Sequence, residues 1–212
     1  MSAEIRSRVR VPMTFADGYS TVAEVMTFRG LADGSEHLLL ALGEWEDAVV
    51  RAEMGGEAPL VRPHSECLTG DVLGSERCDC GPQLREAVER IAATGGFLLY
   101  LRQEGRGIGL YAKLDAYALQ DSGLDTYEAN LALGHAEDER DYTAVAQMLE
   151  AVGVGRVRLL SNNPDKASQL EALGVQVEEQ VPTRVHLTDA NARYLAAKVE
   201  RTGHLIALPG VA

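Results

Sequence analysis

Long hydrophobic runs are missing from this 212-residue sequence, and none approaches the roughly 18 apolar residues of a membrane-spanning helix. Its start, MSAEIRSRVRVP, also lacks the apolar centre of a signal peptide. We therefore expect a cytoplasmic protein without a membrane partner. Internal repeats, low-complexity tracts and proline-rich linkers are absent too. Because 46% of the residues are hydrophobic, we expect one globular domain over residues 1–212.

Positive charge is scarce as well. The 20 lysines and arginines stand against 32 aspartates and glutamates, which gives a formal net charge of -12. A duplex nucleic-acid binder needs a broad basic surface, so we expect no nucleic-acid partner. A small anionic ligand is compatible with this charge, because a few arginines that converge in a cleft can outweigh a distant acidic surface. Any such ligand must be held by cationic residues that lie in short motifs.

Only 3 cysteines are present, and an odd number fits a reducing compartment better than a disulfide scaffold. Cys67, Cys78 and Cys80 all lie in one polar stretch, HSECLTGDVLGSERCDCG, residues 64–81. Three soft thiolates so close together indicate a zinc site. Three protein ligands leave a fourth position open for a water that becomes hydroxide near neutral pH. This segment therefore predicts a hydrolase.

Two other interpretations of the cysteine segment stay open. His64 precedes Cys67 by three positions, and with His64 as a ligand the site would be a closed, four-ligand zinc. Alternatively, the cysteines are buried and inert, since free cysteine is among the most buried residue types. Their polar neighbours Asp71, Asp79 and Gly81 are unsuited to a core and argue against inert cysteines. We favour three ligands plus solvent.

The order of strand and helix patterns predicts an α/β fold, a mixed β-sheet with flanking helices in a single domain. We expect residues 5–80, the N-terminal part, to be β-rich and residues 81–205 to alternate between strands and helices. The expected strands cover residues 19–28, 37–42, 48–51, 60–61, 97–102, 156–160 and 175–181. The expected helices include residues 84–92, 110–118, 141–152, 164–173 and 189–202.

The stretch LRQEGRGIGL, residues 101–110, is a glycine-rich turn between a buried strand and a helix. Its backbone N–H groups can face an anion, helped by the helix dipole. Glu104 adds a carboxylate that accepts N–H bonds, and Arg106 adds a guanidinium that grips a phosphate or a base edge. By spacing alone an ordinary tight turn is the simpler interpretation, because the stretch matches neither a Walker A sequence nor the dinucleotide fingerprint.

Two further charged motifs each have a structural and a functional interpretation. In HAEDERDY, residues 135–142, Asp138 either caps the following helix or accepts a proton while Arg140 acts on a phosphate. In LLSNNPDK, residues 159–166, a strand ends at Ser161 and a helix follows. Ligands of α/β sheets bind at the carboxyl ends of strands, and Lys166 in a first helical turn suits a phosphate. A plain capped turn explains the same residues apart from Lys166.

In combination, these motifs resemble the GTP cyclohydrolase II family of riboflavin biosynthesis. The segment RPHSECLTGDVLGSERCDCGPQL is similar to that family's zinc segment almost residue for residue. RQEGRGIGL, AYALQDSGLDTYEAN, GHAEDERDY and SNNPDK follow in the family's order and spacing. The resemblance is strong over residues 60–166 and looser over residues 36–205. Such a set in order is very specific, although each motif alone is not.

The resemblance implies an enzyme that opens the imidazole ring of GTP. The expected products are 2,5-diamino-6-ribosylamino-4(3H)-pyrimidinone 5′-phosphate, formate and pyrophosphate. It also implies a homodimer with one zinc ion per subunit, held by Cys67, Cys78 and Cys80, and Mg²⁺ on the GTP phosphates. Zinc-activated water would attack the imidazole carbon, and magnesium with cationic side chains would assist the loss of pyrophosphate.

Residue by residue, the resemblance makes Asp138 the proton acceptor, Arg140 the nucleophile and Tyr117 a tyrosine needed for complete ring opening. Because the pKa of arginine exceeds about 12, charge stabilisation is the minimum role for Arg140. The GTP contacts that it implies are Arg62, Pro63, His64, Ser65, Glu66, Gln83, Glu104, Gly105, Arg106, Thr126, Ser161 and Lys166.

The sequence departs from the family pattern at a few positions. Ser161 stands where the family typically has threonine and keeps the hydroxyl, Pro63 replaces a valine, and His135 replaces a phenylalanine. Residues 184–194 form a shorter and less family-like stretch. These departures leave room for a specialised copy in a pathway other than riboflavin synthesis.

Two alternative functions remain. One is ring opening with retention of the formyl group, which gives a formamidopyrimidine, and Tyr117 argues against it. The other is a zinc-stabilised nucleotide-binding module without catalysis, and the presence of Asp138 and Arg140 argues against that.

Overall fold

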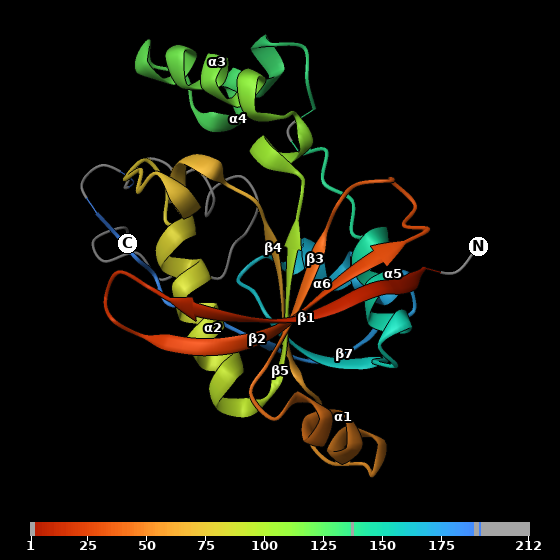
Figure 1. The fold of residues 1–212 in the computed structure, drawn as a ribbon. Helices are drawn as coiled ribbons and strands as arrows, with labels where there is room; N and C mark the ends of the chain where they lie inside the picture. The colour runs from red at the N-terminus through yellow and green to blue at the C-terminus, as the bar shows by residue number, and fades with distance from the viewer. Residues whose placement is uncertain (1–2, 137, 189–190, 192–212) are drawn as a thin grey trace. The chain divides into compact units, whose positions relative to one another are not determined.

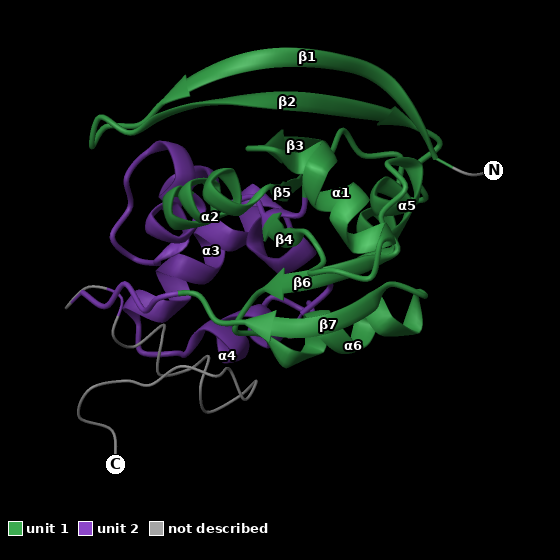
Figure 2. Ribbon diagram, turned by 90° about the horizontal axis from the view of Figure 1, so that it is seen from below, with its two compact units in different colours: residues 1–64, 85–102, 141–183 green, residues 65–84, 103–140, 184–212 purple. Residues whose placement is uncertain are grey.

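The computed structural model describes residues 3–136, 138–188 and 191. The chain divides into two compact units (Figure 2). Unit 1 comprises residues 1–64, 85–102 and 141–183, and unit 2 comprises residues 65–84, 103–140 and 184–212. The expectation of one domain over residues 1–212 stays a prediction.

Unit 1 is built on a mixed seven-stranded sheet (Figure 1). Its strands are β1 (Glu4–Thr14), β2 (Ser20–Arg29), β3 (Leu38–Leu42), β4 (Leu60–Ser65), β5 (Gly96–Leu101), β6 (Arg156–Leu160) and β7 (Gln176–Val181). They are arranged in the order β1-β2-β3-β5-β4-β6-β7. Each pair from β1 through β3 to β5 is antiparallel, whereas β6 runs parallel to both β4 and β7. The mixed sheet confirms the expected α/β class.

Helices accompany this sheet, and the apolar patterns of the sequence predict most of their buried faces. The helices are α1 (Trp45–Glu53), α2 (Cys80–Thr94), whose first residues belong to unit 2, α5 (Thr143–Ala151) and α6 (Pro164–Ala172). Val145, Met148 and Leu149 fall on one face of α5 and are buried in the same core as Phe97 and Leu99 of β5. β5 is almost entirely buried, as its continuous apolar run predicts.

The strand expected over residues 48–51 is wrong, because these residues lie in α1. Ala48 and Ala52 are buried four positions apart on one face of that helix, and a run of four residues is too short to reveal this period. β1 was not among the expected strands, although Arg6, Arg8 and Arg10 alternate with less polar residues in its sequence. Most of its side chains are exposed, as is common for a strand at the edge of a sheet. The helix expected over residues 189–202 lies outside the described residues.

The described part of unit 2 is helical. It contains a π-helical turn, η1 (Leu68–Val72), a 3₁₀ turn, η2 (Glu104–Gly107), and the helices α3 (Leu110–Asp121) and α4 (Thr126–Ala132). α4 was not expected, although Asp125 and Glu128 form a capping box at its start. Across the described ranges, every helix is too short or too polar to span a membrane.

A matched pair of glycine substitutions tests the packing of unit 1. Gly43 and Gly34 both have a positive φ, 62° and 68°. A Cβ at Gly43 would lie 2.3 Å from the backbone oxygen of Ala92, whereas a Cβ at Gly34 would meet nothing within 4 Å. We expect Gly34→Ala to cost about 1 kcal/mol of unfolding free energy from left-handed strain. Gly43→Ala should cost about 2–4 kcal/mol, because overpacking against backbone adds to that strain.

Chemical denaturation of the two variants measures the difference directly. Equal losses of unfolding free energy for Gly43→Ala and Gly34→Ala would contradict the close approach of Gly43 to α2.

Candidate functional site

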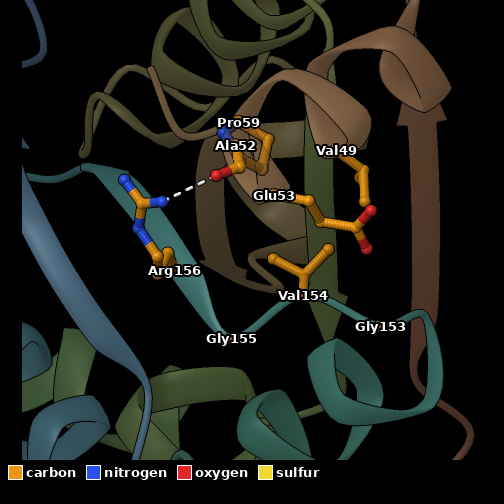
Figure 3. Close-up of a pocket in the computed structure, with 8 residues that line it drawn as sticks. All are labelled: Val49, Ala52, Glu53, Pro59, Gly153, Val154, Gly155 and Arg156. Carbon is orange, nitrogen blue, oxygen red and sulfur yellow. Dashed lines mark hydrogen bonds between the residues drawn. The ribbon is translucent and has the colours of Figure 1, made fainter. Parts of the chain in front are cut away.

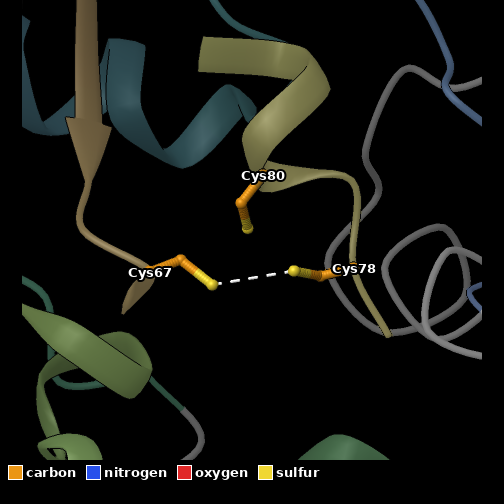
Figure 4. A group of neighbouring side chains, drawn as sticks. All are labelled: Cys67, Cys78 and Cys80. Carbon is orange, nitrogen blue, oxygen red and sulfur yellow. Dashed lines mark hydrogen bonds between the residues drawn. The ribbon is translucent and has the colours of Figure 1, made fainter. Parts of the chain in front are cut away.

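The three cysteines of unit 2 point toward one another (Figure 4). Cys67 directly precedes η1, Cys80 begins α2, and Cys78 lies two residues before Cys80. The Sγ atoms of Cys67 and Cys78 are 3.6 Å apart, and all three Sγ atoms lie within 4.8 Å of one another. Sulfur ligands of a tetrahedral zinc with Zn–S bonds of about 2.3 Å are separated by about 3.8 Å. The three thiols therefore have a spacing that fits this metal.

A glycine lets the three thiols approach one another. A Cβ at Gly70, within η1, would lie 2.7 Å from the Sγ of Cys78 and 3.1 Å from that of Cys67. The backbone N–H of Gly70 faces the Sγ of Cys67 at 3.4 Å, and the backbone N–H of Cys67 donates to Asp71 at 3.0 Å. A backbone N–H of the loop thus points at the sulfur of Cys67, a contact of the kind that orients metal ligands.

The ionisation of the three thiols is unequal. Hydrogen bonds from Cys78 and Cys80 lower the pKa of Cys67 far below its usual range, and the Lys113 ammonium adds to this effect. The hydrogen bond with Cys67 raises the pKa of Cys78 to about 11, and the pKa of Cys80 is raised for the same reason and by burial. All three can become thiolates together only when a cation balances their charge.

The metal-ligating group that the described ranges bring together consists of these three thiols. His64 lies in unit 1, where its ring stacks on Tyr100 with a centroid separation of 5.6 Å. The four-ligand alternative with His64 therefore gains no support.

Lys113 of α3 lies beside the thiols. Its Nζ donates to the Sγ of Cys67 at 3.1 Å, to the Oγ1 of Thr69 at 3.1 Å and to the Oε1 of Glu104 at 2.7 Å. Thr69 in turn contacts the hydroxyl of Tyr117 at 3.5 Å. Unit 2 thus brings two expected site residues, Glu104 and Tyr117, into one hydrogen-bonded network with a cysteine. The sequence reasoning missed Lys113, although a lysine four positions before Tyr117 on a helix was a usable signal.

The glycine-rich turn holds Arg106 in an unusual conformation. Arg106 has a φ of 64°, and no other non-glycine residue among those described has a positive φ. Its guanidinium carbon lies 4.1 Å from the ring centroid of Tyr127, and its Nη1 is buried without a hydrogen-bond partner among the described residues. Its carbonyl accepts the N–H of Glu139 at 2.9 Å. The turn therefore holds a half-buried guanidinium that has one buried N–H group without an acceptor among the described residues, which an ordinary tight turn does not require.

Asp138 and Arg140 of the HAEDERDY segment form an ion pair in unit 2. The Nε of Arg140 donates to the two carboxylate oxygens of Asp138 at 2.8 and 3.1 Å, and the Nη2 of Arg140 donates to Asp138 as well. Burial alone would raise the pKa of Asp138, but the hydrogen bonds and positive charge of Arg140 outweigh it and lower that pKa. The interpretation of Asp138 as a helix cap is wrong, since Tyr142 is the residue that precedes α5, and the N–H of its first residue, Thr143, donates to Asp141.

Several expected GTP contacts belong to unit 1. Lys166 is buried in the first turn of α6 and donates to the carbonyl of Pro63 at 2.9 Å. Arg62 donates to the carbonyl of Leu160 at 2.9 Å, and the hydroxyl of Ser161 accepts the N–H of Asn163 at 3.1 Å. Unit 1 therefore gathers the end of β4, the end of β6 and the start of α6, as expected for parallel strands.

The remaining expected contacts belong to unit 2 and are held locally. The hydroxyl of Ser65 accepts from the side chain of Gln103 at 2.9 Å, and Gln83 donates to Asp79. Glu66 is half-buried, and Thr126 is the first residue of α4.

Unit 1 also contains a pocket of about 250 Å³ that none of the expected site residues lines (Figure 3). Its wall is formed by α1, Pro59 and residues 153–156, and Arg156 donates to the carbonyl of Ala52 at 2.7 Å.

Comparisons with known proteins agree with the motifs. A family model described as GTP cyclohydrolase II matches residues 7–182. GTP cyclohydrolase-2 of Vibrio cholerae is 48% identical over 206 residues, which cover 97% of this chain and 100% of that protein. GTP cyclohydrolase-2 of Vibrio parahaemolyticus is 48% identical over 202 residues, which cover 95% of this chain and 98% of that protein. Riboflavin biosynthesis protein RibBA of Bacillus subtilis is 48% identical over 197 residues, which cover 92% of this chain and 48% of that protein. The chain belongs to the GTP cyclohydrolase II family.

Proposed function

We propose that this protein hydrolyses the imidazole ring of GTP in riboflavin biosynthesis and that zinc on Cys67, Cys78 and Cys80 is its catalytic metal. Membership of the GTP cyclohydrolase II family supports the reaction class. The observation that carries the metal assignment is the set of three Sγ atoms within 4.8 Å of one another, a group with three ligands rather than four among the residues that the structure describes. Held by these three thiolates, zinc would supply a Lewis acid that activates water.

Cationic side chains bind the phosphates of GTP in this proposal, although the protein as a whole is acidic. In unit 2, Arg106 offers a buried N–H donor and a guanidinium that its backbone conformation and Tyr127 hold in place. In unit 1, Lys166 and the N-terminus of α6 add positive charge, and Ser161 adds a hydroxyl. We assign Mg²⁺ to the GTP phosphates, where it would neutralise the charge of the departing pyrophosphate.

Asp138 and Arg140 act as one unit in this proposal. A carboxylate whose pKa is lowered stays ionised at neutral pH and is a weak base, so its first role is to orient Arg140. Arg140 then stabilises developing negative charge, and acceptance of a proton by Asp138 requires the ion pair to loosen when substrate is bound. The resemblance also implies nucleophilic attack by Arg140, but this proposal does not require that additional role.

Tyr117 supplies a neutral hydroxyl beside Thr69 of the cysteine segment. Burial raises its pKa, so the phenol stays protonated and can donate a hydrogen bond to a ring-opened intermediate. This supports complete ring opening with formate release rather than retention of the formyl group. We further propose a homodimer in the cytoplasm.

Formate measured after incubation with GTP, Mg²⁺ and zinc distinguishes the candidate functions. One equivalent of formate per GTP supports the proposal. A ring-opened product without formate would favour the formamidopyrimidine reaction, and GTP binding without turnover would favour a non-catalytic module.

The glycine between the thiols gives a test of the metal site that leaves every ligand in place. We expect Gly70→Ala to lower the zinc content of the purified protein to less than half of one equivalent, because its Cβ would occupy space between Cys78 and Cys67. Gly155→Ala is the matched control, since a Cβ there would meet nothing within 4 Å. Elemental analysis measures both, and full zinc content in Gly70→Ala would contradict the packing of the loop.

A further inference from the structure

We propose that Lys113 is a positioning residue for the metal site, which tunes the electron density on the sulfur of Cys67 through an ammonium-to-thiolate hydrogen bond. The inference rests on the proposed function, since it requires a metal ion on the three thiols.

The ammonium of Lys113 is fully engaged inside unit 2. An ammonium has three N–H donors, and Lys113 has three acceptors, in Cys67, Thr69 and Glu104, at 3.1, 3.1 and 2.7 Å. The residue is only 9% exposed. Burying a lysine costs free energy unless its charge is compensated, so an ammonium at this place needs a nearby anion. Glu104 is one such anion, and the thiolate of Cys67 is the other.

The charge of the metal site gives this contact a function. Three thiolates carry three negative charges, which leave a divalent ion with a net charge of about −1 and reduce its Lewis acidity. A charged N–H donor to one sulfur withdraws electron density from it and offsets part of that loss. Lys113 therefore counteracts the excess charge that a three-thiolate ligand set brings.

Glu104 holds Lys113 in position. Its Oε1 accepts from Lys113, and its Oε2 accepts the backbone N–H of Leu68 at 2.7 Å, so the carboxylate joins η2, α3 and η1. A Cβ at Gly105 would lie 3.0 Å from the Cβ of Lys113, which shows how closely α3 approaches the turn. The N–H of Gly105 also donates to Glu104 at 3.1 Å. Glu104 thus accepts three hydrogen bonds, one each from α3, η1 and its own turn.

Cobalt substitution isolates the effect on the sulfur ligand. In the Co²⁺-loaded full chain, the sulfur-to-cobalt charge-transfer band in the near ultraviolet reports electron density on the thiolates. We expect Lys113→Met to move this band to longer wavelength, because a more electron-rich sulfur gives up an electron more easily. Lys113→Arg should restore most of the original position, since it keeps a charged donor. Arg51→Met, which removes an exposed cation from α1 in unit 1, should leave the band unchanged.

A second variant covers the case in which Lys113→Met does not fold. Lys113→Gln keeps an N–H donor without the charge, and we expect a smaller shift in the same direction. An unchanged band in whichever of these variants folds and binds Co²⁺ would overturn the inference, even if thermal stability fell, because a merely structural lysine does not act on the sulfur. A wild-type protein that takes up no Co²⁺ and no zinc would overturn the proposed metal site itself.

Discussion

Cys78→Ser is expected to lower the rate of formate release by at least about 1,000-fold. Removal of one of three sulfur ligands destroys the metal site, and the lost Lewis-acid contribution of several kcal/mol corresponds to about this factor. The side chain of Cys78 is buried beside Cys67 and Gly70, so a serine of similar size fits the space without a cavity. Formate release should therefore fall because a metal ligand is missing and not because the fold is damaged. The free energy of unfolding, measured on metal-free proteins, should change little.

Pyrophosphate release is the second measurement on this variant. If pyrophosphate loss and ring opening are separate reactions, Cys78→Ser retains the first and loses the second. Glu76→Gln, an exposed change in the same loop, is the control and should retain both. Formate release at the wild-type rate in Cys78→Ser would refute the assignment of the three thiols to the catalytic metal.

Arg106→Met is expected to weaken GTP binding by about 10- to 100-fold, since a hydrogen bond to a charged group is worth about 1.5–3 kcal/mol. Methionine keeps an unbranched side chain at the same positive φ of 64°, so the variant changes the guanidinium and not the backbone requirement. Arg106→Lys keeps the charge but loses the planar donor set, and an intermediate affinity is expected for it. Isothermal titration with GTP in magnesium buffer gives these dissociation constants.

The same position permits a test of stored strain. In Arg106→Gly the positive φ is no longer strained, which stabilises the turn by about 1 kcal/mol. Loss of the contact with Tyr127 opposes this gain by about 0.5–2 kcal/mol, so the unfolding free energy should change little while GTP affinity falls.

An unchanged GTP affinity in Arg106→Met would show that the buried donor of Arg106 does not serve the nucleotide.

The sequence was informative wherever a pattern is long or chemically specific. The apolar runs of β5 and β6, and the three cysteines between residues 64 and 81, predicted buried strands and a thiol cluster. Residues 48–51 were misassigned because a run of four residues has no readable period, and only Ala52, outside the run, completes the buried face of α1. β1 was missed although its arginines alternate with less polar residues over residues 5–11, which is a usable signal for an edge strand.

Other features depended on contacts between distant residues. The positive φ of Arg106 follows from the path of η2 and is not encoded by an arginine. The role of Lys113 needed α3, η1 and η2 to come together, since its three acceptors lie between 9 and 46 positions away. The start of α5 illustrates the same limit, because Asp138 and Asp141 are equally suited to a helix start by type, and only the structure shows that Thr143 donates its N–H to Asp141.

Mass spectrometry of the product tests the central claim most directly. Zinc-replete protein is incubated with GTP and Mg²⁺, and the nucleotide product is identified together with formate and pyrophosphate. We predict a 2,5-diamino-6-ribosylamino-4(3H)-pyrimidinone 5′-phosphate that has lost the imidazole carbon, with one equivalent each of formate and pyrophosphate. A product that keeps this carbon as a formyl group, or GTP recovered unchanged, would contradict the account.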